Sequence, residues 1–197
     1  MDPGCLVRVV VSMTVMATEK DSIPFSSFFS PAEVICQIPE KDRDKALLDM
    51  LRLVAQQHEI GNVEEAHAAV LERENDLPTV VAPGLAMPHA RLDTIDEIVV
   101  AVATSRTGIV YDPAKPDNRV KLIVLTLAPK GSPGAYLQAL GCLARICQDP
   151  STAEVVAGFA TPDEVWAFFD QGGLVHPERL YGRNVMDPVQ VKKLLQQ

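Results

Sequence analysis

A proline followed by a histidine, with an arginine two residues further on, is the group in this chain best suited to chemistry. The run is Met87-Pro88-His89-Ala90-Arg91. Pro88 fixes its own φ and pushes the preceding residue toward extended geometry, so we expect the imidazole to lie on a stiff backbone. Imidazole is well suited to act as a nucleophile near neutral pH. The pattern therefore indicates a histidine that carries a phosphoryl group.

Two arginines could support a phosphoryl group on this histidine. Arg91 is two residues from His89, and Arg73 lies at the end of a predicted helix, in Leu71-Glu72-Arg73-Glu74. Guanidinium groups bind phosphate through two hydrogen bonds, so an arginine beside a phosphorylated imidazole would have a chemical purpose. A cation in the last turn of a helix also complements the helix dipole, and the two roles of Arg73 are compatible.

The other histidines point to no second site. His58, His67 and His176 have no metal-ligand spacing to one another or to a cysteine pair, and we expect structural or solvent-facing roles for them. No metal site is therefore expected. A small hydrolase is poorly supported, because no Gly-x-Ser-x-Gly elbow occurs and no carboxylate pair stands out near His89.

The elements that would position His89 alternate between helices and apolar strands. Helices are predicted over 41–57, from 62 to about 73, from 132 to about 148, and after the capping pairs Ser151–Glu154 and Thr161–Glu164. Strands are predicted over 98–104 and 120–128, with a short one near 79–82 and a polar surface excursion over 107–119. The two long strands are apolar on both faces, so they belong inside a sheet that helices cover on both sides. The predicted class is an α/β sandwich.

Length, charge and cysteine content limit the classes of partner and the cellular compartment that we expect for this protein. A length of 197 residues favours one domain, and a net charge of −8 argues against nucleic acid as a partner. The apolar segment 6–16 is too short to span a bilayer, so no membrane insertion is expected. The cysteines form no CxxC pair, which favours reduced thiols and a cytoplasmic protein. Residues 1–24 are expected to form a weakly ordered extension, and 173–197 a tail of undefined role.

The arginine segment, sixteen residues upstream of His89, together with the histidine segment resembles a known family. It is the fructose/mannitol and nitrogen-regulatory class of enzyme IIA domains (EIIA type 2) of the phosphoenolpyruvate-dependent phosphotransferase system. The resemblance extends over residues 25–172 and includes three further segments: Phe29-Ser30-Pro31, Ala128-Pro129-Lys130-Gly131 and Tyr136-Leu137-Gln138-Ala139-Leu140.

The resemblance implies a mixed five-stranded sheet flanked by helices on both faces. His89 matches the family's phosphorylated histidine, and Arg73 matches the arginine that supports the phosphorylated site. Such a phosphotransferase component accepts the phosphoryl group from the phosphocarrier HPr or its nitrogen-regulatory relative. It then passes the group to a sugar-transporter domain or signals to a regulated protein. No cofactor is implied, because the imidazole itself is the carrier.

Two departures from the family pattern leave an alternative open. The family usually has a glycine-rich loop before the histidine, whereas this chain has Thr79-Val80-Val81-Ala82-Pro83-Gly84. Where the family often has a second histidine, this chain has Tyr136, which can donate a hydrogen bond but carries no positive charge at neutral pH. Tyr136 also fits a helical stripe and could belong to the core. The alternative is a protein-binding regulatory module that cannot transfer phosphoryl groups.

Overall fold

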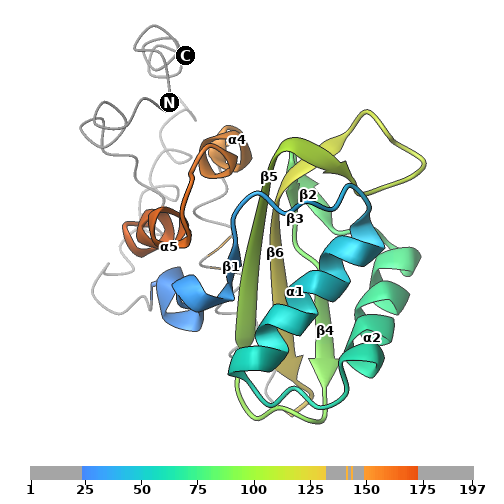
Figure 1. The fold of residues 1–197 in the computed structure, drawn as a ribbon. Helices are drawn as coiled ribbons and strands as arrows, with labels where there is room; N and C mark the ends of the chain where they lie inside the picture. The colour runs from blue at the N-terminus through green and yellow to red at the C-terminus, as the bar shows by residue number, and fades with distance from the viewer. Residues whose placement is uncertain (1–23, 132–140, 142, 144–148, 173–197) are drawn as a thin grey trace, which may run out of the picture.

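The computed structural model describes residues 24–131, 141, 143 and 149–172. A central sheet separates two layers of helices, as Figure 1 shows. In chain order the elements are η1 (Phe25–Phe28), η2 (Pro31–Glu33), β1 (Val34–Ile35), α1 (Arg43–Gln57), α2 (Val63–Asp76), β2 (Val80–Ala82), β3 (Leu85–Ala86), β4 (His89–Leu92), β5 (Val99–Val110), β6 (Arg119–Pro129), α4 (Thr152–Ala157) and α5 (Pro162–Asp170). The α/β sandwich is confirmed. The predicted extension, the tail and the helix over 132–148 fall almost wholly outside the described residues.

The sheet is mixed and contains six strands rather than the five expected. Its order is β1-β5-β6-β3-β2, and β4 also pairs with β6. Strands β3 and β4 both run parallel to β6 in one continuous register, because Leu85 pairs with Leu122 and His89 pairs with Thr126. Between them lies Pro88, which has no N–H to donate to a ladder. Strands β3 and β4 therefore occupy one position in the sheet, beside β6, with Pro88 interrupting their pairing. The six described strands thus fill five positions across the sheet.

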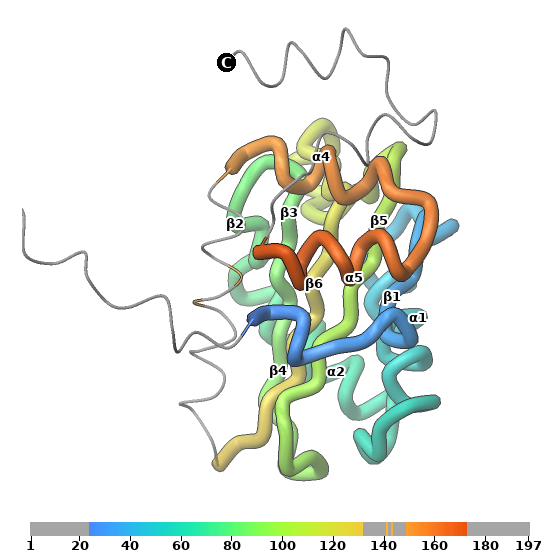
Figure 2. The backbone as a smooth tube through the Cα atoms, turned by 90° about the vertical axis from the view of Figure 1, so that its left-hand side faces the viewer, coloured from blue at the N-terminus to red at the C-terminus, as the bar shows by residue number. Residues whose placement is uncertain are grey.

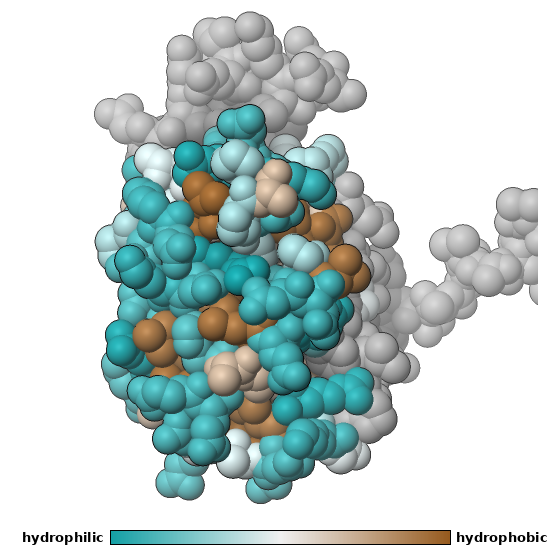
Figure 3. All heavy atoms as spheres, turned by 90° about the vertical axis from the view of Figure 1, so that its right-hand side faces the viewer, coloured by the Kyte–Doolittle hydropathy of each residue, from teal (hydrophilic) through white to brown (hydrophobic). Residues whose placement is uncertain are grey.

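Helices cover both faces of the sheet, as expected. On one face α1 and α2 pack against a large apolar core that includes Ala90, Ile123 and Leu125. Figure 2 shows η1, α4 and α5 in front of the other face, where they enclose a second core around Leu122, Val124 and Phe169. Figure 3 shows that the solvent side of the first helical layer is mostly hydrophilic, with separate hydrophobic spots.

Local capping sets most of the helix starts. Asp42 accepts hydrogen bonds from the N–H groups of Asp44 and Lys45, so α1 begins at Arg43. Asn62 caps α2, and Thr161 with Glu164 forms the predicted capping box of α5. The other predicted capping box was wrong. The side chain of Ser151 makes no cap hydrogen bond to α4, because the backbone of Ser151 is helical (φ −83°, ψ −10°) and not extended as at an N-cap; its hydroxyl donates to Asp149 over 2.7 Å.

The predicted surface excursion over 107–119 was too long. Strand β5 continues to Val110, and β6 begins at Arg119. The pairing of the two strands shifts register between Thr104 and Ile109. Gly108 lies in this irregularity with a φ of +72°, a conformation that glycine adopts without strain. A polar segment with a glycine thus forms a bulge inside the strand rather than the beginning of a loop.

Candidate functional site

His89 is the first residue of β4 and is partly buried. Side chains alternate between the faces of a strand. Its neighbour Ala90 belongs to the core beneath α1 and α2, so His89 projects from the opposite face, beside its pairing partner Thr126. The ring Nδ1 lies 3.3 Å from the carbonyl oxygen of Met87. A carbonyl can only accept, so in this contact Nδ1 carries the proton and, in the neutral ring, Nε2 carries the lone pair.

Arg91 shares the face of His89. The two residues are two apart on β4, a separation of about 7 Å along a strand. Arg91 is exposed, whereas Ala90 between them is buried. The strand therefore places a guanidinium stem and an imidazole on the same side of the sheet, as a shared phosphate contact would require.

Arg73 lies in the last turn of α2, on the layer that covers the other face of the sheet. Its Nη1 donates a hydrogen bond to the carbonyl oxygen of Leu77, over 3.2 Å, and the side chain is partly buried. This contact confirms the expected interaction of the arginine with the end of its own helix. Its support of a phosphoryl group on His89 stays a prediction. Tyr136 lies outside the described residues, so its expected place near His89 also stays a prediction.

The glycine-poor segment before His89 is a hairpin. Strand β2 pairs antiparallel with β3, and Gly84 forms the turn between them with a φ of +72°. The Gly84 carbonyl oxygen accepts hydrogen bonds from Lys121 N and Leu122 N, at 2.7 and 3.0 Å. This glycine ties the hairpin to β6. The valines and Pro83 of the departure lie in the hairpin and not in an open loop.

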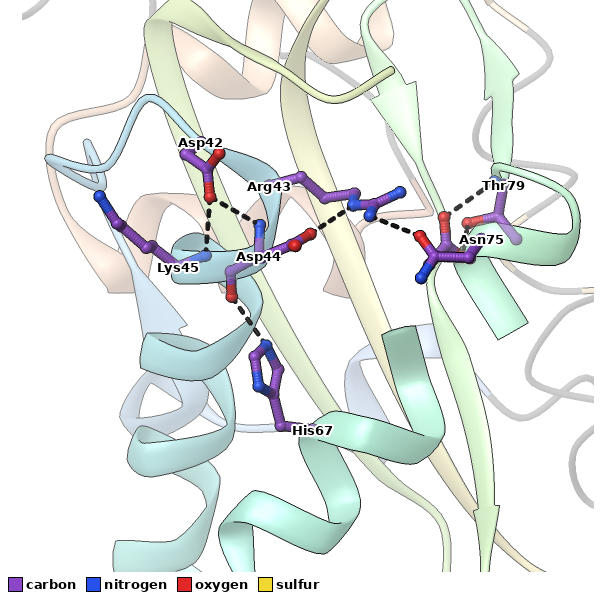
Figure 4. Close-up of polar contacts among 8 residues, drawn as sticks. Asp42, Arg43, Asp44, Lys45, His67, Asn75 and Thr79 are labelled. Carbon is purple, nitrogen blue, oxygen red and sulfur yellow. Dashed lines mark hydrogen bonds and ion pairs between the residues drawn. The ribbon is translucent and has the colours of Figure 1, made fainter. Parts of the chain in front are cut away.

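The sequence analysis missed a buried polar cluster at the end of α2. Glu74 is fully buried and accepts two hydrogen bonds from Thr79, one from the backbone N–H at 3.0 Å and one from the hydroxyl at 2.6 Å. Figure 4 shows this contact beside Asn75, whose side-chain oxygen accepts a hydrogen bond from Arg43. A signal for it was present, because Glu74 continues the inward-facing spacing of Ala66 and Val70.

Tyr111 completes this cluster. Its side chain is fully buried, and its hydroxyl has no hydrogen-bond partner within the part of the chain that the structure describes. Burial raises the pKa of Tyr111 far above its ordinary value, and the nearby Glu74 carboxylate raises it further. The hydroxyl is therefore neutral at every physiological pH.

The remaining described histidines have structural contacts. His58 Nε2 lies 3.3 Å from a Glu33 carboxylate oxygen, and His67 Nε2 lies 2.8 Å from the carbonyl oxygen of Asp44. These contacts confirm the structural roles expected for both. Within the described ranges, no three His, Cys, Asp or Glu side chains come together as metal ligands. Nor does any helix there have the length and apolar character needed to cross a membrane.

A mixed sheet between two helical layers, with a histidine at the start of a strand that pairs with β6 and its ring beside a backbone carbonyl, defines the general class: an α/β sandwich domain. The sequence model described as phosphoenolpyruvate-dependent sugar phosphotransferase system, EIIA 2, matches residues 27–172. The chain belongs to this family.

Individual relatives agree with the family. The fructose-specific EIIA component of Haloferax volcanii is 32% identical over 120 residues, which are 60% of this chain and 77% of that protein. By contrast, the chain spans only 24% of the 2-O-alpha-mannosyl-D-glycerate-specific EIIABC component of Escherichia coli, at 25% identity over 87% of this chain.

Solved structures show the same fold. The nitrogen regulatory protein IIA-Ntr from Neisseria meningitidis matches with a TM-score of 0.65 at 20% identity, covering 73% of this chain and 97% of that one. Enzyme IIAMTL, solved in its complex with phosphorylated enzyme IIBMTL from Escherichia coli, matches with a TM-score of 0.62 at 16% identity, covering 73% and 97%. The family expected from the two motif segments is thus confirmed.

Proposed function

We propose that His89 accepts a phosphoryl group from an HPr-type phosphocarrier and then passes it on or signals through it. The observation that carries this proposal is the contact between His89 Nδ1 and the Met87 carbonyl oxygen. It favours the proton on Nδ1, so the lone pair of Nε2 attacks the phosphorus. The new N–P bond forms as the bond from phosphorus to the donor atom breaks, and the donor atom keeps that electron pair.

The arginines have separate proposed roles. Arg91 lies on the face of His89 and would contact the phosphoryl oxygens directly. Arg73 would approach from the end of α2 and steady the group once it is bound, and Tyr136 would donate a hydrogen bond from the helix predicted over 132–148. These roles rest on strand geometry for Arg91 and on the family motif for the other two.

The proposed partners are proteins of the phosphotransferase system. HPr or its nitrogen-regulatory relative would be the donor, and the acceptor would be a transporter domain of the IIB kind or a regulated protein. Two names support these choices: a relative is a fructose-specific EIIA component, and a similar structure was solved as a complex with phosphorylated enzyme IIBMTL. Such exchange between carrier proteins would take place in the cytoplasm.

One observation favours the alternative, a binding module that cannot transfer phosphoryl groups. Val80 and Ala82 form strand β2 and pair with β3. Backbone N–H groups that belong to a hairpin are less available to an anion than those of an open glycine-rich loop. A chain of this fold could then bind the donor protein without taking its phosphoryl group.

The test is phosphorylation of the full chain with phosphoenolpyruvate, enzyme I and HPr, read as an acid-labile, base-stable adduct. We expect label on the wild type, none on His89→Ala, and full label on His58→Gln, a matched control whose histidine pairs with Glu33. Label that persists in His89→Ala contradicts the proposal. A wild type that binds phosphorylated HPr but gains label only after Tyr136→His supports the alternative.

A further inference from the structure

A continuous line of hydrogen bonds connects the end of α2 with the ring of His89. The Glu74 carboxylate accepts from the Thr79 N–H and from the Thr79 hydroxyl, at 3.0 and 2.6 Å. The Thr79 carbonyl oxygen then accepts from the N–H of Met87, at 3.0 Å. The Met87 carbonyl oxygen in turn meets His89 Nδ1 at 3.3 Å. Each step uses a backbone or carboxylate group with a defined direction.

The first contact of this line, between Thr79 and the Glu74 carboxylate, lies in the protein interior. Glu74 is fully buried, and within the described part of the chain it has no ion pair within 4.0 Å. A buried carboxylate without a counter-ion depends on hydrogen bonds for its stability. Thr79, which is itself buried, donates two hydrogen bonds to Glu74. The position of Thr79 is therefore fixed tightly relative to α2.

The position of Thr79 in turn constrains Met87 and Pro88, the two residues before His89. Pro88 follows Met87 and fixes its own φ, and its carbonyl oxygen accepts from Thr126 N at 3.0 Å. Met87 is thus held on one side by Thr79, and the residue after it is held on the other side by β6. The carbonyl of Met87 has little freedom to turn away from the imidazole of His89.

We propose that Glu74 and Thr79 are positioning residues for His89. They act through Met87 to keep the proton on Nδ1, so that Nε2 is the nitrogen that can bond to phosphorus. This inference rests on the proposed function, but the state of the ring is measured separately from phosphorylation. Because Glu74 follows Arg73 directly on α2, the same pair fixes the helix turn of the arginine relative to the histidine strand.

The experiment measures the tautomer of His89 in the full chain with ¹⁵N-labelled histidine. In the wild type we expect the Nδ1–H form. Thr79→Val removes the hydroxyl at similar volume, and Glu74→Gln removes the charge and one acceptor. Both are expected to shift the population toward the Nε2–H form and to slow phosphorylation by HPr about two- to tenfold, the scale of one hydrogen bond. Thr79→Ser keeps the hydroxyl and should behave as the wild type.

The signal of His67 is the control in the same spectra. Its Nε2 lies against the Asp44 carbonyl oxygen, and a merely destabilised fold would disturb both rings. A His89 tautomer unchanged in folded Thr79→Val overturns the inference. If that variant does not fold, an unchanged tautomer in Glu74→Gln, or a shifted one in Thr79→Ser, overturns it equally. A wild type that HPr never phosphorylates refutes the proposed function, whereas the tautomer shifts still decide the inference.

Discussion

Replacing Gly84 by alanine tests how closely the hairpin before His89 packs against α4. Gly84 has a φ of +72°, and a Cβ there would lie 3.2 Å from the Cβ of Ala153. Gly172 offers a matched control, with a φ of +65° and, among the residues that the structure describes, no atom within 4 Å of its would-be Cβ. The two substitutions share the backbone cost and differ in the space around the new methyl group.

The expected magnitudes follow from these geometries. An L-residue in the left-handed region costs about 1–2 kcal/mol, and alanine stiffens the unfolded chain equally in both variants. Gly172→Ala should therefore lose about 1 kcal/mol of the free energy of unfolding. In Gly84→Ala the methyl contact is too short, and either α4 or the hairpin must shift. Overpacking of this kind costs about 1–3 kcal/mol more.

Urea unfolding of both variants measures the difference. Trp166, the single tryptophan, is a suitable probe because its Nε1–H donates to the carbonyl oxygens of Ser26 and Phe29 and so reports on the packing of α5 against η1. A Gly84→Ala variant as stable as Gly172→Ala would show that the hairpin does not pack against α4 as described. A Gly172→Ala variant with no loss would refute the assumed backbone cost.

Two further predictions concern buried polar groups. Burial alone would raise the pKa of Glu33, but hydrogen bonds from the hydroxyl and the N–H of Ser30 and the contact with His58 outweigh it and lower that pKa. The stability from this carboxylate is present above its unfolded pKa of about 4.3 and is lost as the pH falls through the lower folded value. Glu33→Gln should therefore lose about 1–2 kcal/mol at pH 7, and urea titrations should show the gap to wild type narrowing below about pH 4. A gap that widens in acid would contradict the sign. Tyr111→Phe, which removes a buried hydroxyl without a described partner, should leave stability unchanged or raise it by about 1 kcal/mol; a clear loss in thermal unfolding would show that the hydroxyl is bonded.

The apolar patterns predicted the sandwich well because its long helices bury one consistent face and its two long strands are buried on both faces. The sequence predicts an apolar stripe of Leu47, Leu48, Leu51, Val54 and Ala55 on α1; Leu47, Leu51 and Val54 are buried, whereas Leu48 is half-buried and Ala55 is exposed. Most residues of β5 and β6 are buried as expected. The details that failed depend on contacts between segments distant in sequence. The length of β5 was set by a bulge at Gly108 against Arg119, which no local pattern shows.

The site was only partly predictable for the same reason. The Pro88-His89 step predicts a stiff backbone beside the imidazole, but no strand was predicted over 89–92, where the structure has β4. The burial of Glu74 does not follow readily from the sequence either, because charged residues at a helix end are ordinarily exposed. Its partner Thr79 lies beyond the helix, and only the folded chain shows that a carboxylate on the apolar face is satisfied there.

The hydrogen bond between Thr79 and Met87 explains how the hairpin can depart from the family pattern while the frame of the site remains. Thr79 and Met87 stand at the two ends of the hairpin and bond to each other directly. The position of His89 relative to α2 therefore depends on this hydrogen bond and not on the residues of β2. The side chains of Val80–Ala82 are exposed or only partly buried. Substitutions within β2 leave both ends in place, whereas a change at Thr79 removes the contact on which the position of Met87 depends. Arg73 and His89 are sixteen residues apart in the sequence. Their relative position in space thus depends on the short segments 74–79 and 87–89, and the hairpin between these segments only connects them.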